Sequence, residues 1–533
     1  MAGIRIRIPA HQTGNIMGEK IRGLWKVLFG RTTIFVFLIL IQLAVIVVGI
    51  GLIGTKVLVA NNVVGVLSII VLVYLINVRL NNSFKLMWII LIVATPVIGV
   101  PFFIYSRIQP GTRHIARRID EQIHEQRNWL LPEKDTVDRL EVDAGNEFGL
   151  FKYLFEEAHY PVYDNCGIEY YPFGQDKFEA LLAQLKTARR FIFMEYFIIG
   201  KGEMWDAVLK ILQQKAREGV EVRVLYDGTN TMLRLPKGYP KELEAKGIAC
   251  RVFSPMKPVI TTHQNFRDHR KIVVIDGHTA FTGGVNLADE YINKKERFGV
   301  WKDTAVMVKG KAANNFTLMF LQMWNIRSKT PENYNQYMYR ECAGKDENVT
   351  YGGYIVPYGD NPLDDEEVGK KVYMDILNRA SKYVHIMTPY LIIDEEVTNS
   401  LIFAAQRGID VKIILPFIPD KRYAYALART HYEELIRGGV KIYEYLPGFV
   451  HAKSFVSDDE KAVVGTINMD FRSMFLHFEC AAYIWHNPVV KEVESDFEAT
   501  LLDCQRITLR HCKETPLLTK ICGRALRLIA PLM

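Results

Sequence analysis

Three apolar runs dominate the first hundred residues of the chain. They cover residues 33–53, 57–78 and 86–105, and the first of them contains no charged residue. Because a helix rises about 1.5 Å per residue, about 20 apolar residues cross a hydrocarbon core of about 30 Å. We therefore expect a basic N-terminal segment over 1–32 and a transmembrane region over 33–106.

The number of crossings stays open at this stage. The run 57–78 is a weaker candidate for a membrane span, because the polar residues Asn61 and Asn62 lie near its start. The prolines and glycine of 86–105 favour a kinked or re-entrant segment. Basic residues flank the region on both sides, so the positive-inside rule places both flanks in the cytosol, which requires an even number of crossings. Three buried helices of a soluble protein are the alternative, although three such runs within so short a stretch are rare in soluble cores.

Beyond the linker predicted over 107–160, the pattern of helices and apolar strands occurs twice. Four segments of the first copy match four segments of the second: 181–199 with 375–393, 216–228 with 405–416, 243–255 with 435–447, and 269–287 with 451–469. Continuous apolar strands between helices are typical of an α/β domain, here with a mixed sheet. We predict a duplicated α/β fold, with domains over 161–335 and 336–515 related by a pseudo-two-fold axis. Residues 516–533 form an apolar tail with basic residues, which is either an amphipathic interfacial helix or packed on the domains.

Charge is distributed unevenly between these regions. The chain of 533 residues carries a net charge of +7, but no acidic residue lies between Glu19 and Asp120, and residues 120–533 carry −5. A nucleic-acid-binding domain would show a basic footprint there, so the charge argues against a nuclease. The apolar runs predict a multi-pass protein of the cell membrane. Seven cysteines without a C-x-x-C pair favour reduced thiols, and so place its domains on the cytoplasmic side.

The two copies carry the same chemical motif at equivalent places. His269, Lys271 and Asp276 form H-x-K-x4-D in the first copy, and His451, Lys453 and Asp458 form it in the second. The residues that follow also match in spacing: Gly284 and Asn286 after the first motif, Thr466 and Asn468 after the second. One such motif has little meaning, whereas two with the same continuation predict one shared site. The alternative is an idle, solvated His-Lys pair on each strand.

The residue types indicate phosphodiester chemistry. Histidine and lysine two apart on a strand share a face, and the pseudo-two-fold axis would gather two imidazoles and two ammonium groups in one pocket. Lysines and the candidate substrate-binding residues Asn286, Asn468, Gly284 and Thr466 would hold the phosphoryl oxygens without a metal. One imidazole attacks phosphorus while the other protonates the leaving group, which a pair near the ordinary pKa of histidine can do. Asp276 and Asp458 lie next to turns and are expected to hold their loops.

Each imidazole also needs a partner for its second nitrogen. Asp303 and Glu479 lie in the next strand-like segment of their own copies, 34 residues after His269 and 28 after His451. We assign these two residues as the carboxylates that orient the imidazoles. The alternative for each is a surface carboxylate.

The motifs resemble those of the phospholipase D superfamily, whose paired H-x-K-x4-D motifs form one metal-independent site. The segments 265–277 and 465–479 look like those of bacterial cardiolipin synthases, except that His477 stands where that family often has asparagine. The resemblance implies transfer of a phosphatidyl group between two phosphatidylglycerols through a phosphohistidine, with no cofactor. It implies that His269 attacks phosphorus and His451 transfers protons, although the repeat permits the reverse.

Three rival functions follow from the same residues. A phospholipase D-type hydrolase or another headgroup exchanger would use identical chemistry with a different acceptor. A nuclease is disfavoured by the charge of residues 120–533. A non-catalytic membrane scaffold is disfavoured because both histidines and both lysines are present. We expect phosphatidylglycerol and the lipid bilayer as partners and no nucleic acid; the sequence does not define the oligomeric state.

Overall fold

The computed structural model describes residues 55–108, 110–230, 234–255, 265–328, 332–340 and 349–532. The chain divides into two compact units, residues 1–109 with 259–261, and residues 110–258 with 262–533. Each unit has its own core, so each is described by itself.

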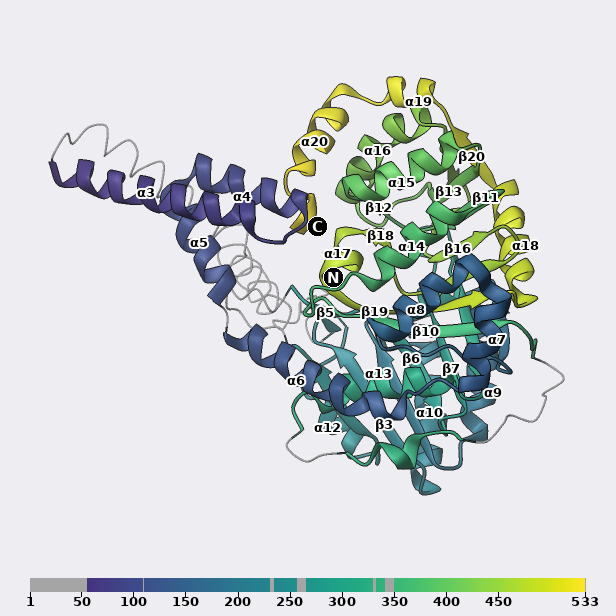
Figure 1. Ribbon diagram of the computed structural model, residues 1–533. Helices are drawn as coiled ribbons and strands as arrows, with labels where there is room; N and C mark the ends of the chain where they lie inside the picture. Colours follow the sequence, from purple (N-terminus) through teal and green to yellow (C-terminus); the bar gives the residue numbers. More distant parts are fainter. Residues whose placement is uncertain are drawn as a thin grey trace, which may run out of the picture. The chain divides into compact units, whose positions relative to one another are not determined.

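The first unit consists of three helices in its described part: α3 (Thr55–Asn77), α4 (Asn82–Ala94) and α5 (Pro96–Ile108) (Figure 1). Their buried contacts involve Leu75 of α3, Ile92 of α4 and Phe103 of α5. Helices α4 and α5 approach closely at Gly99, where a Cβ would lie 2.8 Å from the Cα of Ile92. A larger residue at 99 would therefore separate the two helices.

The predicted transmembrane runs correspond only partly to these helices. The run 33–53 lies outside the described residues, and the described part of 57–78 belongs to α3. The run 86–105 is two helices instead of one kinked span, because Pro96 lacks an N–H and keeps Thr95 out of the helical conformation. Among the helices that the structure describes, none combines the length and apolar character that crossing a membrane requires. The structure thus gives the multi-pass prediction no support.

The second unit begins with helices where the sequence suggested a linker. Residues 107–160 include α6 (Pro110–Gln126), α7 (Lys134–Ala144) and α8 (Phe148–Glu156). Helix α6 is fixed to the first α/β half by two hydrogen bonds, from Arg118 to the carbonyl of Ser328 at 2.6 Å and between Gln322 and Gln126 at 2.8 Å. This stretch is therefore packed on the α/β halves.

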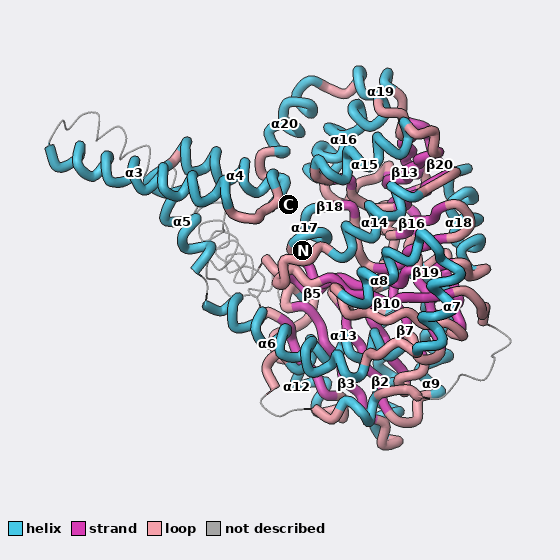
Figure 2. Tube along the Cα trace, in the orientation of Figure 1, coloured by secondary structure: helices cyan, strands magenta, loops and turns pink. Residues whose placement is uncertain are grey.

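The strands of the two α/β halves follow the same order, and the second half has one further strand at its edge. Figure 2 shows the strands in magenta with helices in cyan around them. In the first half the order is β1 (Gly167–Tyr171), β9 (Ala305–Lys309), β7 (Thr279–Gly283), β6 (Lys271–Ile275), β2 (Phe191–Tyr196), β3 (Glu221–Asp227) and β4 (Ala249–Phe253). In the second half it is β10 (Tyr354–Asp360), β19 (His477–Trp485), β17 (Lys461–Gly465), β16 (Ser454–Ser457), β11 (Tyr383–Met387), β13 (Asp410–Pro416), β14 (Lys441–Tyr445) and β20 (Cys504–Ile507). Strands β2, β3 and β4 pair in parallel, as do β11, β13 and β14, and the remaining neighbours are antiparallel. The predicted duplicated α/β fold with mixed sheets is confirmed.

Helices flank both sheets in equivalent positions. The first half carries α9 (Gly174–Thr187), α10 (Glu203–Arg217), α12 (Tyr239–Glu244) and α13 (Ala313–Asn325). The second carries α14 (Val368–Arg379), α15 (Glu395–Gln406), α16 (Arg422–Arg437) and α18 (Val489–Leu502). Helix α13 contacts β10 of the second half and α18 contacts β1 of the first, so the two halves share one apolar core.

Two short parallel strand pairs also connect the halves. Strand β5 (Arg267–Asp268) pairs with the start of β19, and β15 (Gly448–Val450) pairs with β8 (Val300–Lys302). Just beyond them, the N–H of His269 donates to the carbonyl of Phe478 at 2.9 Å and the N–H of His451 donates to that of Lys302 at 2.7 Å. Each motif histidine is therefore anchored through its backbone to the opposite half.

The C-terminal helix α20 (Leu517–Arg527) has one packed and one exposed side. It packs on α16, where a Cβ on Gly523 would lie 2.6 Å from the carbonyl oxygen of Ala426. Leu517 and Leu518 on the other side are 72% and 73% exposed. The tail predicted over 516–533 is thus packed on the second half and still amphipathic.

The two motif aspartates hold turns, as expected. The carboxylate of Asp276 accepts from the backbone N–H groups of residues 189, 190 and 191, and that of Asp458 accepts from those of residues 381, 382 and 383, at 2.7–2.9 Å. Both aspartates have positive φ, 55° and 60°. Each one fastens the turn after a motif strand to the start of the neighbouring antiparallel strand, β2 or β11.

Replacing Asp458 by alanine should destabilise the fold without touching the imidazoles. Three N–H groups lose a charged acceptor, so we expect a loss of about 2–4 kcal/mol in the free energy of unfolding, measured by urea denaturation. Asp459→Ala is the matched control, because Asp459 has the same φ of 60° but accepts one side-chain bond, from Tyr383. Equal losses in the two variants would show that backbone strain, and not the three bonds, causes the effect.

Candidate active site

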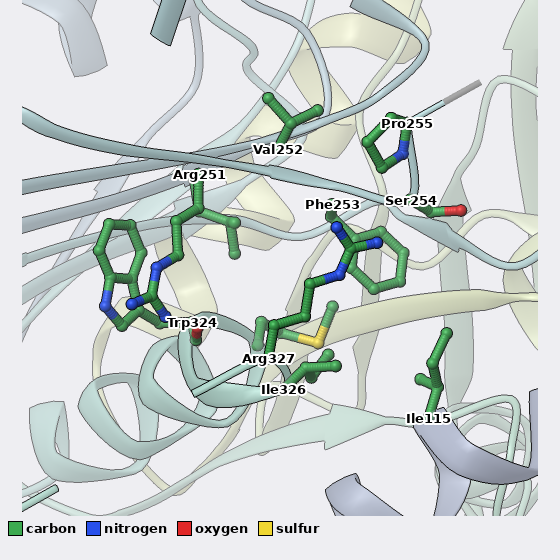
Figure 3. Close-up of a pocket in the computed structure, with 11 residues that line it drawn as sticks. Ile115, Arg251, Val252, Phe253, Ser254, Pro255, Trp324, Ile326 and Arg327 are labelled. Atoms are coloured by element: carbon green, nitrogen blue, oxygen red, sulfur yellow. Dashed lines mark hydrogen bonds between the residues drawn. The ribbon is translucent and has the colours of Figure 1, made fainter. Parts of the chain in front are cut away.

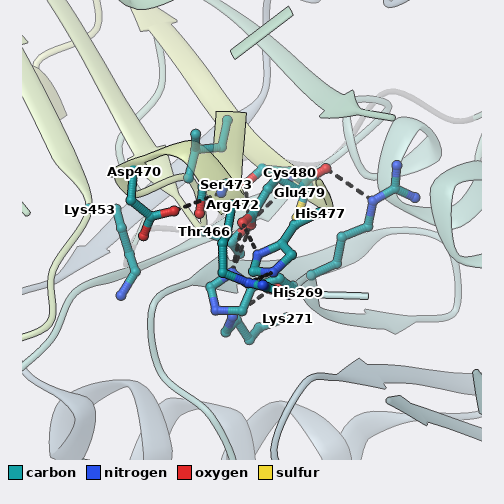
Figure 4. A network of polar contacts seen from close by, with 12 residues as sticks. His269, Lys271, Lys453, Thr466, Asp470, Arg472, Ser473, His477, Glu479 and Cys480 are labelled. Carbon is teal, nitrogen blue, oxygen red and sulfur yellow. Dashed lines mark hydrogen bonds and ion pairs between the residues drawn. The ribbon is translucent and has the colours of Figure 1, made fainter. Parts of the chain in front are cut away.

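The four motif side chains lie buried where the two halves meet, and Figure 4 shows three of them, His269, Lys271 and Lys453. His269 lies two residues before β6, which begins at Lys271, and His451 lies three residues before β16. His269 is 6% exposed and His451 7%. Both lysines turn back on their own motifs: Lys271 Nζ donates to the carbonyl of His269 at 2.5 Å, and Lys453 Nζ donates to that of His451.

The two orienting carboxylates are exchanged between the halves. His269 Nδ1 lies 2.8 and 2.9 Å from the carboxylate oxygens of Glu479, and His451 Nδ1 lies 2.6 Å from Oδ2 of Asp303. Both carboxylates were predicted from their places in their own copies, and the structure pairs each with the histidine of the other copy. In both imidazoles a carboxylate lies at Nδ1, which in His451 is also 2.8 Å from Lys453 Nζ. Nε2 is therefore the ring nitrogen left for chemistry.

Burial and mutual repulsion shift the ionisation of the whole cluster. Burial, followed by Lys271, Lys453 and His451, lowers the pKa of His269 well below its usual value. Burial and Lys453 outweigh Asp303 and lower the pKa of His451 to about 4. Burial likewise lowers the pKa of Lys271 to about 8 and that of Lys453 to about 7. The expectation of two imidazoles near their ordinary pKa is therefore not met, because the site is dry and crowded with cationic groups.

Gly284 and Thr466, expected to bind substrate, instead contact the orienting carboxylates. A Cβ on Gly284 would overlap Oδ1 of Asp303, so only glycine lets Asp303 reach His451. Thr466 Oγ1 donates to Oε2 of Glu479 and accepts from the N–H of Cys480 at 3.0 Å. These equivalent positions thus both place the carboxylate. Gly284 lets Asp303 approach closely, and Thr466 donates a hydrogen bond from its hydroxyl to Glu479.

The two motif asparagines are not equivalent. Asn286 Oδ1 accepts from the N–H of Ile198 at 3.0 Å, and its Nδ2 donates to the hydroxyl of Tyr291 at 2.8 Å. Asn468 Oδ1 is buried without a hydrogen-bond partner among the described residues. Asn286 therefore holds the scaffold, whereas Asn468 keeps a polar atom for a ligand.

The rings that pack on the imidazoles were not predicted from the sequence, which marked His477 only as a departure from the family's asparagine. Phe197 and His477 lie against His269, with ring centroids 4.9 and 5.2 Å away, and Trp301 lies 5.3 Å from His451. Trp301 and His477 each stand two residues before the carboxylate of their strand, and this period of two could have identified them.

Two clusters in the described part of the chain could in principle hold a metal: His269, His477 and Glu479, and on another surface His385, Glu494 and Glu498. In the first cluster His269 is bonded to Glu479 and His477 Nε2 accepts from Arg472. In the second, Lys412 Nζ bonds Glu498 at 2.9 Å. Both clusters already act as hydrogen-bonded groups.

A cavity of about 390 Å³ lies in the first half away from the imidazoles (Figure 3). Its lining is mostly apolar, including Phe253 and Trp324, with the guanidinium groups of Arg251 and Arg327. Arg251 donates to the carbonyl of Trp324 and stacks on its ring at 4.4 Å. None of the motif residues lines this cavity.

Two repeated α/β halves that share one site of two histidines and two lysines define a phospholipase D-like protein. The comparisons with known proteins agree. A family model described as "Cardiolipin synthase, PLD-like domain" matches residues 181–324 and 373–501. The chain belongs to this cardiolipin synthase family of PLD-like proteins.

Individual relatives extend the match over most of the chain. An uncharacterized protein of Streptococcus mutans is 46% identical over 86% of this chain and 99% of its own length. A cardiolipin synthase of Alkalihalophilus pseudofirmus is 34% identical over 84% of this chain and 88% of its own. Among solved structures, a phosphatidylserine synthase of Haemophilus influenzae has the same fold, with a TM-score of 0.53 at 13% identity over 69% of this chain and 95% of its own.

Gly284→Ala tests the exchanged pair of His451 and Asp303. The added Cβ displaces Asp303 from His451. We therefore expect kcat for phosphatidyl transfer, measured by mass spectrometry of the lipid products, to fall about 100-fold or more, as when a histidine loses its orienting carboxylate. Gly238→Ala is the control, because a Cβ there meets nothing within 4 Å. Wild-type turnover in a correctly folded Gly284→Ala protein would contradict the role of this contact.

Proposed function

We propose that the protein is a cardiolipin synthase, which transfers a phosphatidyl group from one phosphatidylglycerol to another and releases glycerol. The observation that carries the proposal is the pair of buried imidazoles, each bound through Nδ1 to a carboxylate of the opposite half. Membership in the cardiolipin synthase family supports the substrate class.

The first half of the reaction forms a covalent intermediate. His269 Nε2 attacks phosphorus, the bond from phosphorus to the glycerol oxygen breaks, and His451 gives its Nε2 proton to the departing glycerol. His269 is then bound to phosphorus and His451 is neutral. Glu479 and Asp303 hold the rings and balance the positive charge that develops on them.

The second half reverses these steps with a new acceptor. His451 takes the proton from a glycerol hydroxyl of a second phosphatidylglycerol, whose oxygen attacks phosphorus. The bond from phosphorus to His269 breaks, which gives cardiolipin and restores both imidazoles. The assignment of nucleophile and acid can also run the other way, and the intermediate experiment below distinguishes them.

An anionic phosphodiester complements the charge of the empty site. Repulsion among Lys271, Lys453 and the imidazoles contributes to their low pKa values. A bound phosphodiester carries one negative charge, so it raises the pKa of His451 and of both lysines, and protonates His451 for its role as acid. The partnerless oxygen of Asn468 accepts a substrate hydroxyl in this arrangement.

The first unit would hold the enzyme at the membrane. Apolar side chains of α3 are exposed, including Ile69 at 63% and Val73 at 56%, and they form a surface suited to acyl chains. We infer that this unit, together with the apolar run 33–53, brings the protein to the lipid bilayer.

Substitution of either motif histidine should abolish synthesis. We expect His269→Ala and His451→Ala each to lower cardiolipin formation from phosphatidylglycerol by at least about 10³-fold, measured by mass spectrometry of the lipids. His486→Ala is the control, because this exposed histidine lies at the far end of β19. Unchanged lipid conversion in both motif variants would refute the enzymatic function.

Trapping the intermediate separates the two histidine roles. With phosphatidylglycerol labelled in its phosphatidyl part, His269→Ala should retain no covalent label, whereas His451→Ala should accumulate acid-labile label slowly. The reverse result would exchange the roles. Phosphatidic acid as the main wild-type product would instead favour a hydrolase, and loss of activity in chelator would contradict the metal-free mechanism.

A further inference from the structure

His477 is a third imidazole beside the motif histidines. It opens β19 two residues before Glu479, so both side chains lie on one face of the strand, and Figure 4 shows it next to His269. It is 8% exposed, and burial lowers its pKa to about 3, so it is neutral in the folded protein. The mechanism above does not use this residue.

Arg472 of α17 (Phe471–Phe475) fixes the tautomer of His477. Its Nε lies 3.0 Å from His477 Nε2, and a guanidinium can only donate. Nε2 is therefore the accepting nitrogen, and the single hydrogen of the neutral ring sits on Nδ1. Nδ1 lies 3.4 Å from Oε1 of Glu479 and makes no hydrogen bond to the described residues. Catalytic hydrogen bonds that are long in a free enzyme commonly shorten when substrate is bound.

Glu479 has one polar neighbour that its counterpart lacks. His269 and Thr466 donate to it, and Nδ1 of His477 lies 3.4 Å from it. In the other half, the residues at the same register positions are Asp303, Gly284 and Trp301, because Gly283 pairs with Ala305 as Gly465 pairs with Ala481. Asp303 accepts from His451 and from the backbone N–H of Thr304 at 3.0 Å, and the indole N–H of Trp301 has no hydrogen-bond partner among the described residues. The two motif imidazoles thus bind carboxylates with different neighbours.

We propose that His477, held by Arg472, is a positioning residue that orients Glu479 and limits its basicity, and so makes His269 differ from His451. The relay runs from Arg472 through His477 and Glu479 to His269. The proposal rests on the proposed function, because the difference between the imidazoles matters only if one attacks and the other transfers protons.

The direction of the effect follows from the charges that face His477. Among the described residues these are Glu479 from its own strand, His269 from the segment before β6, and Arg472 from α17. Without the Nδ1–H of His477, Glu479 has fewer donors and becomes a stronger acceptor. It then stabilises protonated His269 more, and a larger share of the nucleophile is protonated at a given pH.

The test compares two substitutions of His477. Leucine removes the hydrogen bond with Arg472 and the Nδ1–H beside Glu479, whereas asparagine keeps an acceptor for Arg472 and a donor for Glu479. For His477→Leu we expect kcat/KM to fall about 10- to 100-fold and the acid limb of its pH profile to move up by about 0.5–1 unit. For His477→Asn we expect both quantities to stay within about threefold and about 0.2 unit of wild type.

His431→Leu serves as the matched control. His431 is a buried histidine on α16 whose pKa burial lowers to about 3, and it lies 3.5 Å from Arg527. Its loss should lower the melting temperature and leave the pH profile unchanged. If His477→Leu folds and keeps the wild-type profile, or if leucine and asparagine reduce kcat/KM equally with no pH shift, the positioning role is wrong.

A second measurement does not require a folded variant. In wild-type protein labelled with 15N in histidine, the resonances of His477 should report the Nδ1–H tautomer throughout pH 5–9; an Nε2–H tautomer or a cation would overturn the proposal. Failure of the proposed function would look different, since wild-type protein would then make no cardiolipin whatever the tautomer of His477.

Discussion

Two short parallel strand pairs between the halves determine where the chemistry can occur. β5 lies on β19 and β15 lies on β8, and each pair ends directly before a motif histidine. The backbone N–H of each histidine then bonds to the carbonyl of the residue directly before the carboxylate of the opposite half, Phe478 for His269 and Lys302 for His451. This crossed backbone pairing brings each imidazole to the carboxylate that orients it. A phospholipase D-like half folded alone would have a histidine and a carboxylate but not the bond between them.

The site combines burial with an excess of cationic groups. Two imidazoles and two lysines face each other with little solvent, and the result is a set of pKa values below their usual range. Such a cluster of cationic groups is unfavourable by itself and is relieved by an anion. In the proposed reaction a phosphodiester supplies that charge. Under the proposed roles, the low pKa of His269 keeps its Nε2 available for attack, and the bound anion raises the pKa of His451.

Duplication produced the two halves, but the halves are not identical. Gly284 and Thr466 place their carboxylates by opposite means, and Asn286 is used in the scaffold while Asn468 keeps a partnerless oxygen. Trp301 and His477 occupy equivalent positions, and each packs its ring on a motif imidazole, Trp301 on His451 and His477 on His269. Only His477 also accepts a hydrogen bond through its ring, from Arg472. Such differences give the two imidazoles different surroundings, which favours nucleophilic attack at one and proton transfer at the other.

The sequence by itself determined the repeat, the mixed α/β class, the two motifs and the turn-holding role of Asp276 and Asp458, since these depend on spacing and local periodicity. It also selected Asp303 and Glu479, but not their exchange, because pairing across a pseudo-two-fold axis is a long-range property without a local signal. The split of 86–105 at Pro96 was underestimated, as were the helices between 107 and 160. The pKa values of the imidazoles, the scaffold role of Asn286 and the packing of His477 on His269 were decided only by tertiary structure, because burial and contacts between residues distant in the sequence set them.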